Sequence, residues 1–148
     1  MNDKMISYFE SQTCASISCV DADGHPYCFN CFYVFDAENG SIYFKSSAET
    51  FHGQCMLNNA NVAGTILPDK LNKLALKGIQ FTGRIICDEV VKEKANSKYH
   101  REYPLALAMP GDIWTIKLLS AKLTDNSLGF GKKIKWNLEE ELLPESNI

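Results

Sequence analysis

Hydroxyl side chains and one cation stand together where a short strand is expected to end and a helix to begin. The segment Ser46-Ser47-Ala48-Glu49-Thr50 follows Lys45, and His52 comes two residues later. The first amides of a helix lack intrahelical acceptors, and with the positive end of the helix dipole they favour an anion. Hydroxyl donors and the Lys45 charge strengthen this prediction of an anion site. The alternative is that Ser46 and Glu49 only cap the helix, as a capping box.

An apolar run precedes this segment and is expected to position it. Residues 27–35 are almost all aromatic or small and apolar, with one amide, Asn30, in the middle. Such a near-continuous run predicts a strand that is buried on both faces. Asn39-Gly40 then indicates a tight hairpin, because these residues readily adopt the positive φ angles that such a turn requires. Residues 41–45 should therefore pair with the apolar run and lead into the hydroxyl cluster.

The six cysteines include one Cys-x-x-Cys spacing, formed by Cys28 and Cys31. In a redox motif such a pair opens a helix, whose dipole lowers the thiol pKa. Here both lie inside the expected strand, where residues three apart point to opposite faces. We therefore predict no metal site there. Because no secretory signal is evident, we interpret all six cysteines as reduced thiols.

The composition limits the class of protein. The 148 residues predict a single domain over 1–148, and 45% hydrophobic with 22% charged residues is usual for a globular chain. No apolar run approaches a membrane span, and no secretory leader is evident, so we expect a cytoplasmic protein without a membrane partner. The net charge of −3 argues against a nucleic-acid partner.

The remaining pattern predicts a mainly β fold with a few helices. Short strands separated by tight turns are typical of an antiparallel barrel or sandwich, and the helices are too few for a doubly wound parallel sheet. The six expected strands cover residues 14–20, 27–35, 41–45, 62–67, 74–87 and 112–124. The expected helices cover residues 3–12, 46–57 and 88–103.

Three stretches then point to a known family: Asn30-Cys31-Phe32-Tyr33-Val34-Phe35-Asp36, Gly78-Ile79-Gln80-Phe81-Thr82-Gly83 and Thr124-Asp125-Asn126-Ser127-Leu128-Gly129-Phe130-Gly131-Lys132-Lys133. With them the chain resembles the YhbP-like branch of the pyridoxamine 5′-phosphate oxidase-like FMN-binding split barrels. The resemblance covers nearly the whole chain. It implies a six-stranded antiparallel Greek-key split barrel, and a homodimer with an FMN site at its interface.

The resemblance also implies which residues hold the cofactor. The FMN phosphate would be bound by Lys45, Ser46, Ser47, Thr50 and His52. The isoalloxazine ring would border Phe29, Asn30 and Cys31, while Gln80, Phe130 and Lys132 would approach from one or other subunit. The oxidase has an Arg-Lys pair at the start of the helix, where this chain has Phe51 and His52. The oxidase's C-terminal His and Arg pattern is not evident either, so pyridoxamine phosphate oxidation is not the expected activity.

Alternatives without a ligand remain open for three of these residues. His52, one turn into the expected helix, could equally be a surface side chain. Gln80 on a strand either faces solvent or reaches a ligand. Lys132 either approaches the ligand or belongs to a solvated basic turn before a final strand that contains Trp136.

Three functions are compatible with the sequence. The first is an FMN-dependent oxidoreductase acting on a small molecule that the sequence does not identify, without an identified catalytic residue. The alternative is a non-enzymatic protein that binds or senses flavin or haem. A nucleic-acid-binding barrel, with aromatic residues stacking on bases, is disfavoured by the negative net charge.

Overall fold

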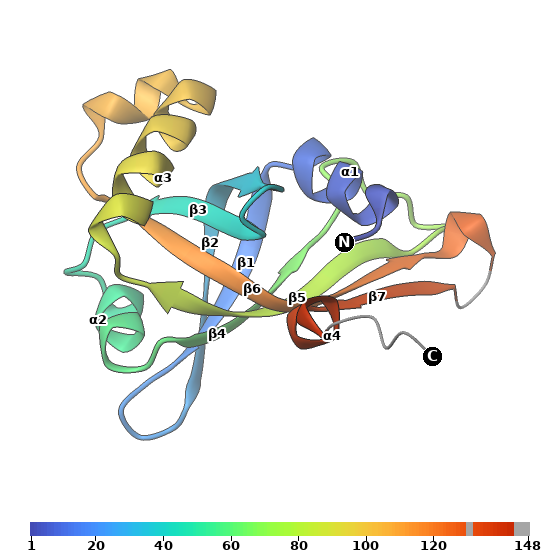
Figure 1. The fold of residues 1–148 in the computed structure, drawn as a ribbon, viewed down its shortest axis with the longest axis horizontal. Coiled ribbons are helices and arrows are strands. Elements are labelled where there is room, and N and C mark those ends of the chain that lie inside the picture. Colours follow the sequence, from blue (N-terminus) through green and yellow to red (C-terminus); the bar gives the residue numbers. More distant parts are fainter. Residues whose placement is uncertain (130–131, 144–148) are drawn as a thin grey trace.

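The computed structural model describes residues 1–129 and 132–143 and is built mainly from antiparallel β-strands (Figure 1). Within these residues the strands are β1 (Cys14–Val20), β2 (Pro26–Asp36), β3 (Ser41–Ser46), β4 (Asn61–Ile66), β5 (Lys77–Ile86), β6 (Asp112–Asp125) and β7 (Lys133–Asn137).

Six of these strands close into a barrel. Their order is β3-β2-β1-β4-β5-β6, and β3 also pairs with β6, which closes the ring. Strands β1 to β3 follow one another, and β4 returns to lie beside β1, which is the Greek-key arrangement. The predicted six-stranded antiparallel Greek-key barrel is therefore confirmed. The strand that contains Trp136, β7, pairs with the last part of β6.

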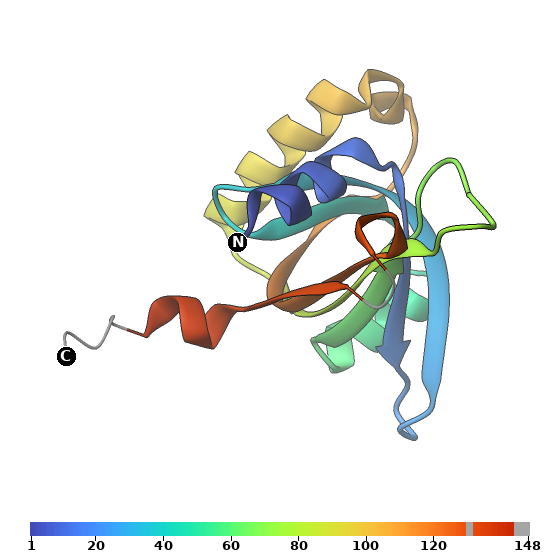
Figure 2. The ribbon, with the colours of Figure 1, turned by 90° about the vertical axis from the view of Figure 1, so that its right-hand side faces the viewer.

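Helices lie on opposite sides of the barrel. Within the described residues they are α1 (Asp3–Ser11), α2 (Phe51–Asn58), α3 (Glu89–Glu102) and α4 (Leu138–Leu142), with the 3-10 turns η1 (Pro104–Ala108) and η2 (Asn126–Leu128). Both ribbon views place α1 and α3 on one side and α2 on the other (Figures 1 and 2). Helix α3 ends before Pro104, since proline cannot donate the next helical hydrogen bond. None of the described helices is both long and apolar enough to span a bilayer.

The barrel interior is apolar, and α1 packs against it. Each barrel strand contributes a buried side chain, among them Ile17, Tyr33, Phe44, Ile66, Phe81 and Leu118. Phe9 of α1 is fully buried and stacks on Phe35 with ring centroids 4.5 Å apart. Burial of these side chains is the main driving force for the fold, at about 1.5–3 kcal/mol for each large apolar residue.

Strand β2 corrects one prediction, because it is not buried on both faces. Tyr27, Cys28 and Asn30 are exposed, and Phe32 is 61% exposed. A strand in a barrel wall turns only one face to the core, and α3 covers only the second half of the outer face of β2. There the hydroxyl of Tyr103 donates to the carbonyl oxygen of Tyr33 at 3.0 Å. The apolar run thus predicted the strand but not its exposed half.

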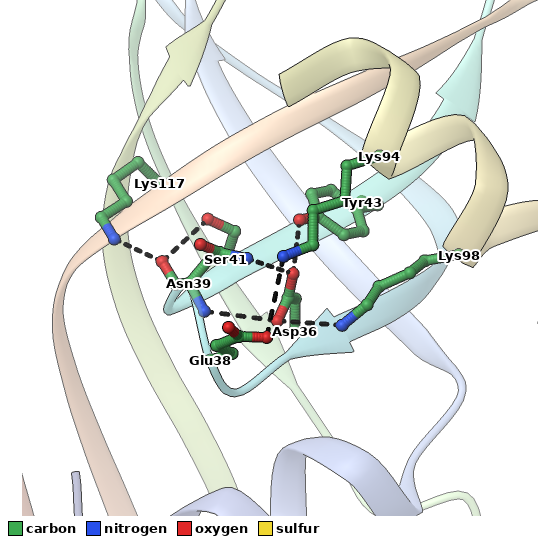
Figure 3. Close-up of polar contacts among 8 residues, drawn as sticks. All are labelled: Asp36, Glu38, Asn39, Ser41, Tyr43, Lys94, Lys98 and Lys117. Carbon is green, nitrogen blue, oxygen red and sulfur yellow. Dashed lines mark hydrogen bonds and ion pairs between the residues drawn. The ribbon is translucent and has the colours of Figure 1, made fainter. Parts of the chain in front are cut away.

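A buried carboxylate, Asp36, joins the β2–β3 hairpin to α3 (Figure 3). It is 1% exposed and accepts from the hydroxyl of Tyr43 at 2.7 Å, from Asn39 Nδ2 at 2.8 Å and from Lys98 Nζ at 3.1 Å. Burial alone would raise the pKa of Asp36, but these hydrogen bonds and the Lys98 charge hold the pKa well below its usual range. The ionised carboxylate therefore fixes α3 against the hairpin.

The same bonds correct the predicted hairpin turn. Only Gly40 adopts a positive φ angle, of 56°, and Asn39 does not. Asn39 is instead held by its side-chain and main-chain bonds to Asp36, and its carbonyl oxygen accepts from Lys117 Nζ. The connection is therefore a longer turn stabilised by side chains.

Replacing Gly64 with alanine is expected to destabilise the barrel. An added Cβ would lie 2.3 Å from a ring carbon of Phe81 and 2.8 Å from the carbonyl oxygen of Ser16. Overpacking of this kind costs about 2 kcal/mol, which urea unfolding would measure. Gly78→Ala is the control, because its Cβ would meet nothing nearer than the Ile66 carbonyl oxygen at 3.3 Å. Equal losses in the two variants would contradict the packing argument.

Candidate functional site

A pocket of about 280 Å³ lies between β2, β3, the start of α2 and the α3–η1 segment. Its walls bring together six of the residues predicted to bind a cofactor: Phe29, Asn30, Cys31, Lys45, Ser46 and His52. They come from the end of β3, the first turn of α2 and the middle of β2. We refer to this cavity as the β2–β3 pocket.

His52 is fixed in the pocket by two contacts. Its ring stacks on Phe29, with centroids 3.8 Å apart and an interplanar angle of 11°. Its Nε2 lies 2.6 Å from the hydroxyl oxygen of Ser46. Burial lowers the pKa of His52, so the imidazole is neutral at pH 7. A neutral imidazole can exchange a hydrogen bond with the Ser46 hydroxyl, and the two side chains form a polar pair on the pocket wall.

Lys45 supplies the positive charge of the pocket and holds the α3–η1 segment. Its Nζ donates to the carbonyl oxygen of Ala106 at 2.6 Å and lies 3.1 Å from His100 Nε2. His100 Nδ1 lies 3.0 Å from the Asn96 carbonyl oxygen, which can only accept, so Nδ1 carries the proton and Nε2 accepts from Lys45. An ammonium group has three N–H donors, so one remains for a ligand.

The start of α2 corrects the predicted capping box. Thr50 is the N-cap, and its hydroxyl oxygen accepts from the amide of Gly53 at 3.0 Å. Ser46 cannot cap the helix, because it still belongs to β3 and its hydroxyl bonds to His52. Ser47 accepts from the amide of Glu49 at 3.1 Å. Ser47 and Thr50 thus shape the turn and do not line the pocket.

Gln80 lies outside the pocket, on the outer face of β5, but the sheet register connects it with Asn30. The Ser16 hydroxyl donates to Asn30 Oδ1 at 2.7 Å, Ser16 faces Thr65 on β4, and Thr65 faces Gln80. Neighbouring strands are about 4.8 Å apart, so three strand spacings place Gln80 roughly 14 Å from Asn30.

Of the last two predicted residues, the structure places only Lys132. Lys132 lies in another hollow, near Lys4 and Asp125. Phe130 lies outside the described residues.

The two cysteines of the Cys-x-x-Cys spacing lie on β2 and face different cavities. Cys31 borders the β2–β3 pocket, whereas Cys28 borders a groove on the outer sheet. Burial, with a smaller contribution from Cys14, raises the pKa of the Cys31 thiol to about 12. Cys31 is therefore protonated at neutral pH and contributes a small apolar wall rather than a nucleophile.

One group of potential metal ligands lies in the β1–β2 turn. Ligand atoms of Asp21, Asp23 and His25 come within 4.8 Å of one another. One carboxylate oxygen of Asp21 already accepts from the amides of Asp23 and His25, at 2.9 and 2.8 Å. These bonds account for the cluster as an ordinary turn.

Sequence reasoning missed the residues that α3 and η1 add to the pocket. Tyr99, Ala106, Met109 and Pro110 line it, and His100 holds Lys45. No local pattern marks them, because they reach the pocket only through the packing of α3 on the barrel. The apolar stretch at residues 105–109 is the nearest signal.

Known structures share this fold. A haem-binding protein from Mycobacterium smegmatis superposes with a TM-score of 0.72 at 13% identity, over 86% of this chain and 53% of that chain. An FAD-binding protein from Mesorhizobium loti has a TM-score of 0.63 at 14% identity, over 82% and 92% of the two chains. HutZ, the haem storage protein of Vibrio cholerae, has a TM-score of 0.60 at 17% identity, over 78% and 87%. At these identities the likeness concerns the fold alone.

Sequence relatives define the family. No family model matches the chain. The UPF0306 protein plu4501 of Photorhabdus laumondii is 42% identical over 119 residues, which are 80% of this chain and 83% of that protein. The UPF0306 protein YhbP of Salmonella paratyphi A is 40% identical over 119 residues, 80% and 81% of the two chains. This chain therefore belongs to the UPF0306 family, the family of YhbP.

Proposed function

We propose that this protein binds FMN, with the phosphate group in the β2–β3 pocket. The observation that carries the proposal is the meeting of Lys45, Ser46 and His52 in one cavity. An ammonium, a hydroxyl and a neutral imidazole are suitable partners for a phosphate, which is mostly a dianion at pH 7. The FAD- and haem-binding names of structural neighbours are consistent with a flat cofactor.

The size of the pocket determines how FMN would lie. A cavity of about 280 Å³ suits the phosphate and part of the ribityl chain, whereas a complete drug-sized ligand needs about 300–1,000 Å³. The isoalloxazine ring would therefore extend over Asn30 onto the outer face of β1 and β4, toward Gln80. This face is open in one chain, and the proposal includes a homodimer in which the partner subunit covers the ring.

Bound FMN supplies hydride and single-electron transfer, so the proposed activity is that of an oxidoreductase for an unidentified small molecule. The residues of this chain would bind and orient the cofactor. Lys45 would neutralise phosphate charge, Phe29 would keep His52 in place, and α3–η1 would shield the phosphate from water.

A non-enzymatic flavin or haem binder is the second candidate. Two structural neighbours are named for haem binding and haem storage. The imidazole of His52 lines the β2–β3 pocket and that of His100 contacts Lys45, and imidazole is a common haem ligand. Bound FMN that no nicotinamide nucleotide reduces would favour a binding role over an oxidoreductase.

The phosphate requirement tests the proposal. Riboflavin has the ring and ribityl chain of FMN but no phosphate, and one lost charge-assisted contact corresponds to at least about ten-fold in affinity. We therefore expect FMN to be retained on a desalting column, with its two visible absorption bands, and riboflavin to be lost. Equal affinities, measured by flavin fluorescence, would contradict the placement of the phosphate. Binding of haem but not FMN would favour the second candidate.

A further inference from the structure

A groove of about 680 Å³ lies on the outer face of β1, β4, β5, β6 and β7. Residues that face one another across neighbouring strands form a row along its floor, in the order Ser16, Thr65, Gln80, Lys122 and Lys135. Opposed residues of antiparallel strands project from the same face. The row therefore ends in two lysines at the β6–β7 edge of the groove.

Beside the first row, the floor of this outer groove is made of short side chains, three of which carry hydroxyl groups. A second row runs beside the first, through Ser18, Ala63, Thr82 and Ser120. Thr82 Oγ1 and Ser120 Oγ lie 2.6 Å apart and share a hydrogen bond. Trp136 borders the groove but lies opposite the buried Ala121 and packs against the barrel core. A surface of this kind suits a small ligand that has a flat ring and forms hydrogen bonds.

The positive charges of two lysines make the groove favourable for anionic ligands. Lys122 and Lys135 stand directly opposite each other, and like charges in this position are destabilising. Across residues 1–129 and 132–143, neither lysine forms an ion pair with a carboxylate. Glu140 also lines the groove but is not paired with either of them. An anion between the lysines would relieve the repulsion.

We propose that Lys122 and Lys135 bind the anionic group of a small, flat substrate that lies in the outer groove. This inference rests on the proposed function, because the bound molecule is a substrate only if the protein is an FMN-dependent oxidoreductase. Ser16 lines the groove and bonds to Asn30, which lines the β2–β3 pocket. A molecule held at Lys122 would thus approach the FMN ring from the end opposite to the phosphate.

Nicotinate, phenyl phosphate and nicotinamide test the inference as probes. The first two carry a carboxylate and a phosphate on a flat ring, while nicotinamide is neutral. Titrating each into ¹⁵N-labelled full-length protein, with and without FMN, should shift the amide resonances of Gln80 and Thr82. We expect at least one anionic probe to bind about ten-fold more tightly than nicotinamide, the difference expected for one charge-assisted contact. Whichever of nicotinate and phenyl phosphate binds more tightly shows whether the groove prefers a carboxylate or a phosphate.

Substitution of the lysines makes the test specific. The double variant Lys122→Gln/Lys135→Gln should lose the preference for anions. The control Lys70→Gln/Lys73→Gln removes the same charge from an exposed loop that does not line the groove, and should keep the preference.

Three results would overturn the inference. They are equal affinity for all three probes, a preference that survives in the Lys122/Lys135 variant, and a variant that changes only the monomer–dimer equilibrium without any probe binding. The last result would mean that the lysines face a partner chain. The FMN-free titration keeps the two proposals separate, because a protein that rejects FMN but prefers anionic probes would refute only the FMN proposal.

Discussion

Replacing Asp36 with alanine is expected to lower the free energy of unfolding by about 3–5 kcal/mol, the usual cost of breaking a buried charged pair. The change leaves the Tyr43 hydroxyl, the Asn39 side-chain amide and the Lys98 ammonium without their shared acceptor. Tyr43 is 1% exposed, so water cannot replace that acceptor without a rearrangement of the hairpin. Urea unfolding followed by circular dichroism measures the loss.

Glu38→Ala provides the matched control. Glu38 belongs to the same hairpin and pairs with Lys94 of the same helix, with 3.7 Å between charged atoms (Figure 3). Its side chain is 80% exposed, and exposed ion pairs contribute only about 0.2–1 kcal/mol. We expect Glu38→Ala to unfold at nearly the same urea concentration as the original protein. Similar losses in both variants would show that burial of Asp36 does not decide the stability of the hairpin.

The pH dependence of the Asp36 contribution has a definite sign. The folded state holds the pKa of Asp36 below its ordinary value of about 3.9, so the unfolded state binds the proton more readily. Its stabilisation is complete well above pH 4 and is lost as pH falls toward the folded-state pKa. The stability difference between the original protein and Asp36→Ala should therefore narrow below about pH 4. A constant difference from pH 7 to pH 3 would contradict an ionised Asp36.

The barrel could be predicted because its strands carry local signals. In β4 and β5 buried and exposed residues alternate, and Asp88 and Pro104 mark both ends of α3. Failures arose where a residue had a competing partner. Ser46 fits a capping box, but in the fold its hydroxyl bonds to His52 and leaves the cap to Thr50.

The candidate site could be predicted only in the part that is continuous with the β2–β3 hairpin. Phe29 and Ser46 meet His52 because the hairpin brings β2 and β3 together, and the turn into α2 is short. Ala106 and His100 come from a segment far along the chain, and their role depends on how α3 packs. Gln80 is connected with Asn30 only by the register of four strands, which no local pattern specifies.

Replacing Lys45 with alanine is expected to weaken FMN binding about ten- to a hundred-fold, since one charge-assisted hydrogen bond is worth roughly 1.5–3 kcal/mol. Lys45 is the cation that lines the β2–β3 pocket, and one of its three N–H donors remains for the phosphate. Fluorescence titration with FMN measures the change. Unchanged affinity would mean that the phosphate binds elsewhere.

Lys45 also holds η1 in place through its hydrogen bond to the carbonyl oxygen of Ala106. A loss of FMN affinity in Lys45→Ala could therefore come from the lost charge or from an opened pocket, and riboflavin binding distinguishes the two. If Lys45 acts through its charge on the phosphate, Lys45→Ala weakens FMN binding and leaves the weaker riboflavin binding unchanged. If it acts by holding the pocket closed, both ligands lose affinity by the same factor. His100→Phe is the matched control, because it removes one clamp contact and keeps the cation. We expect this variant to bind FMN nearly as well as the original protein, since the ammonium–phosphate contact does not require His100.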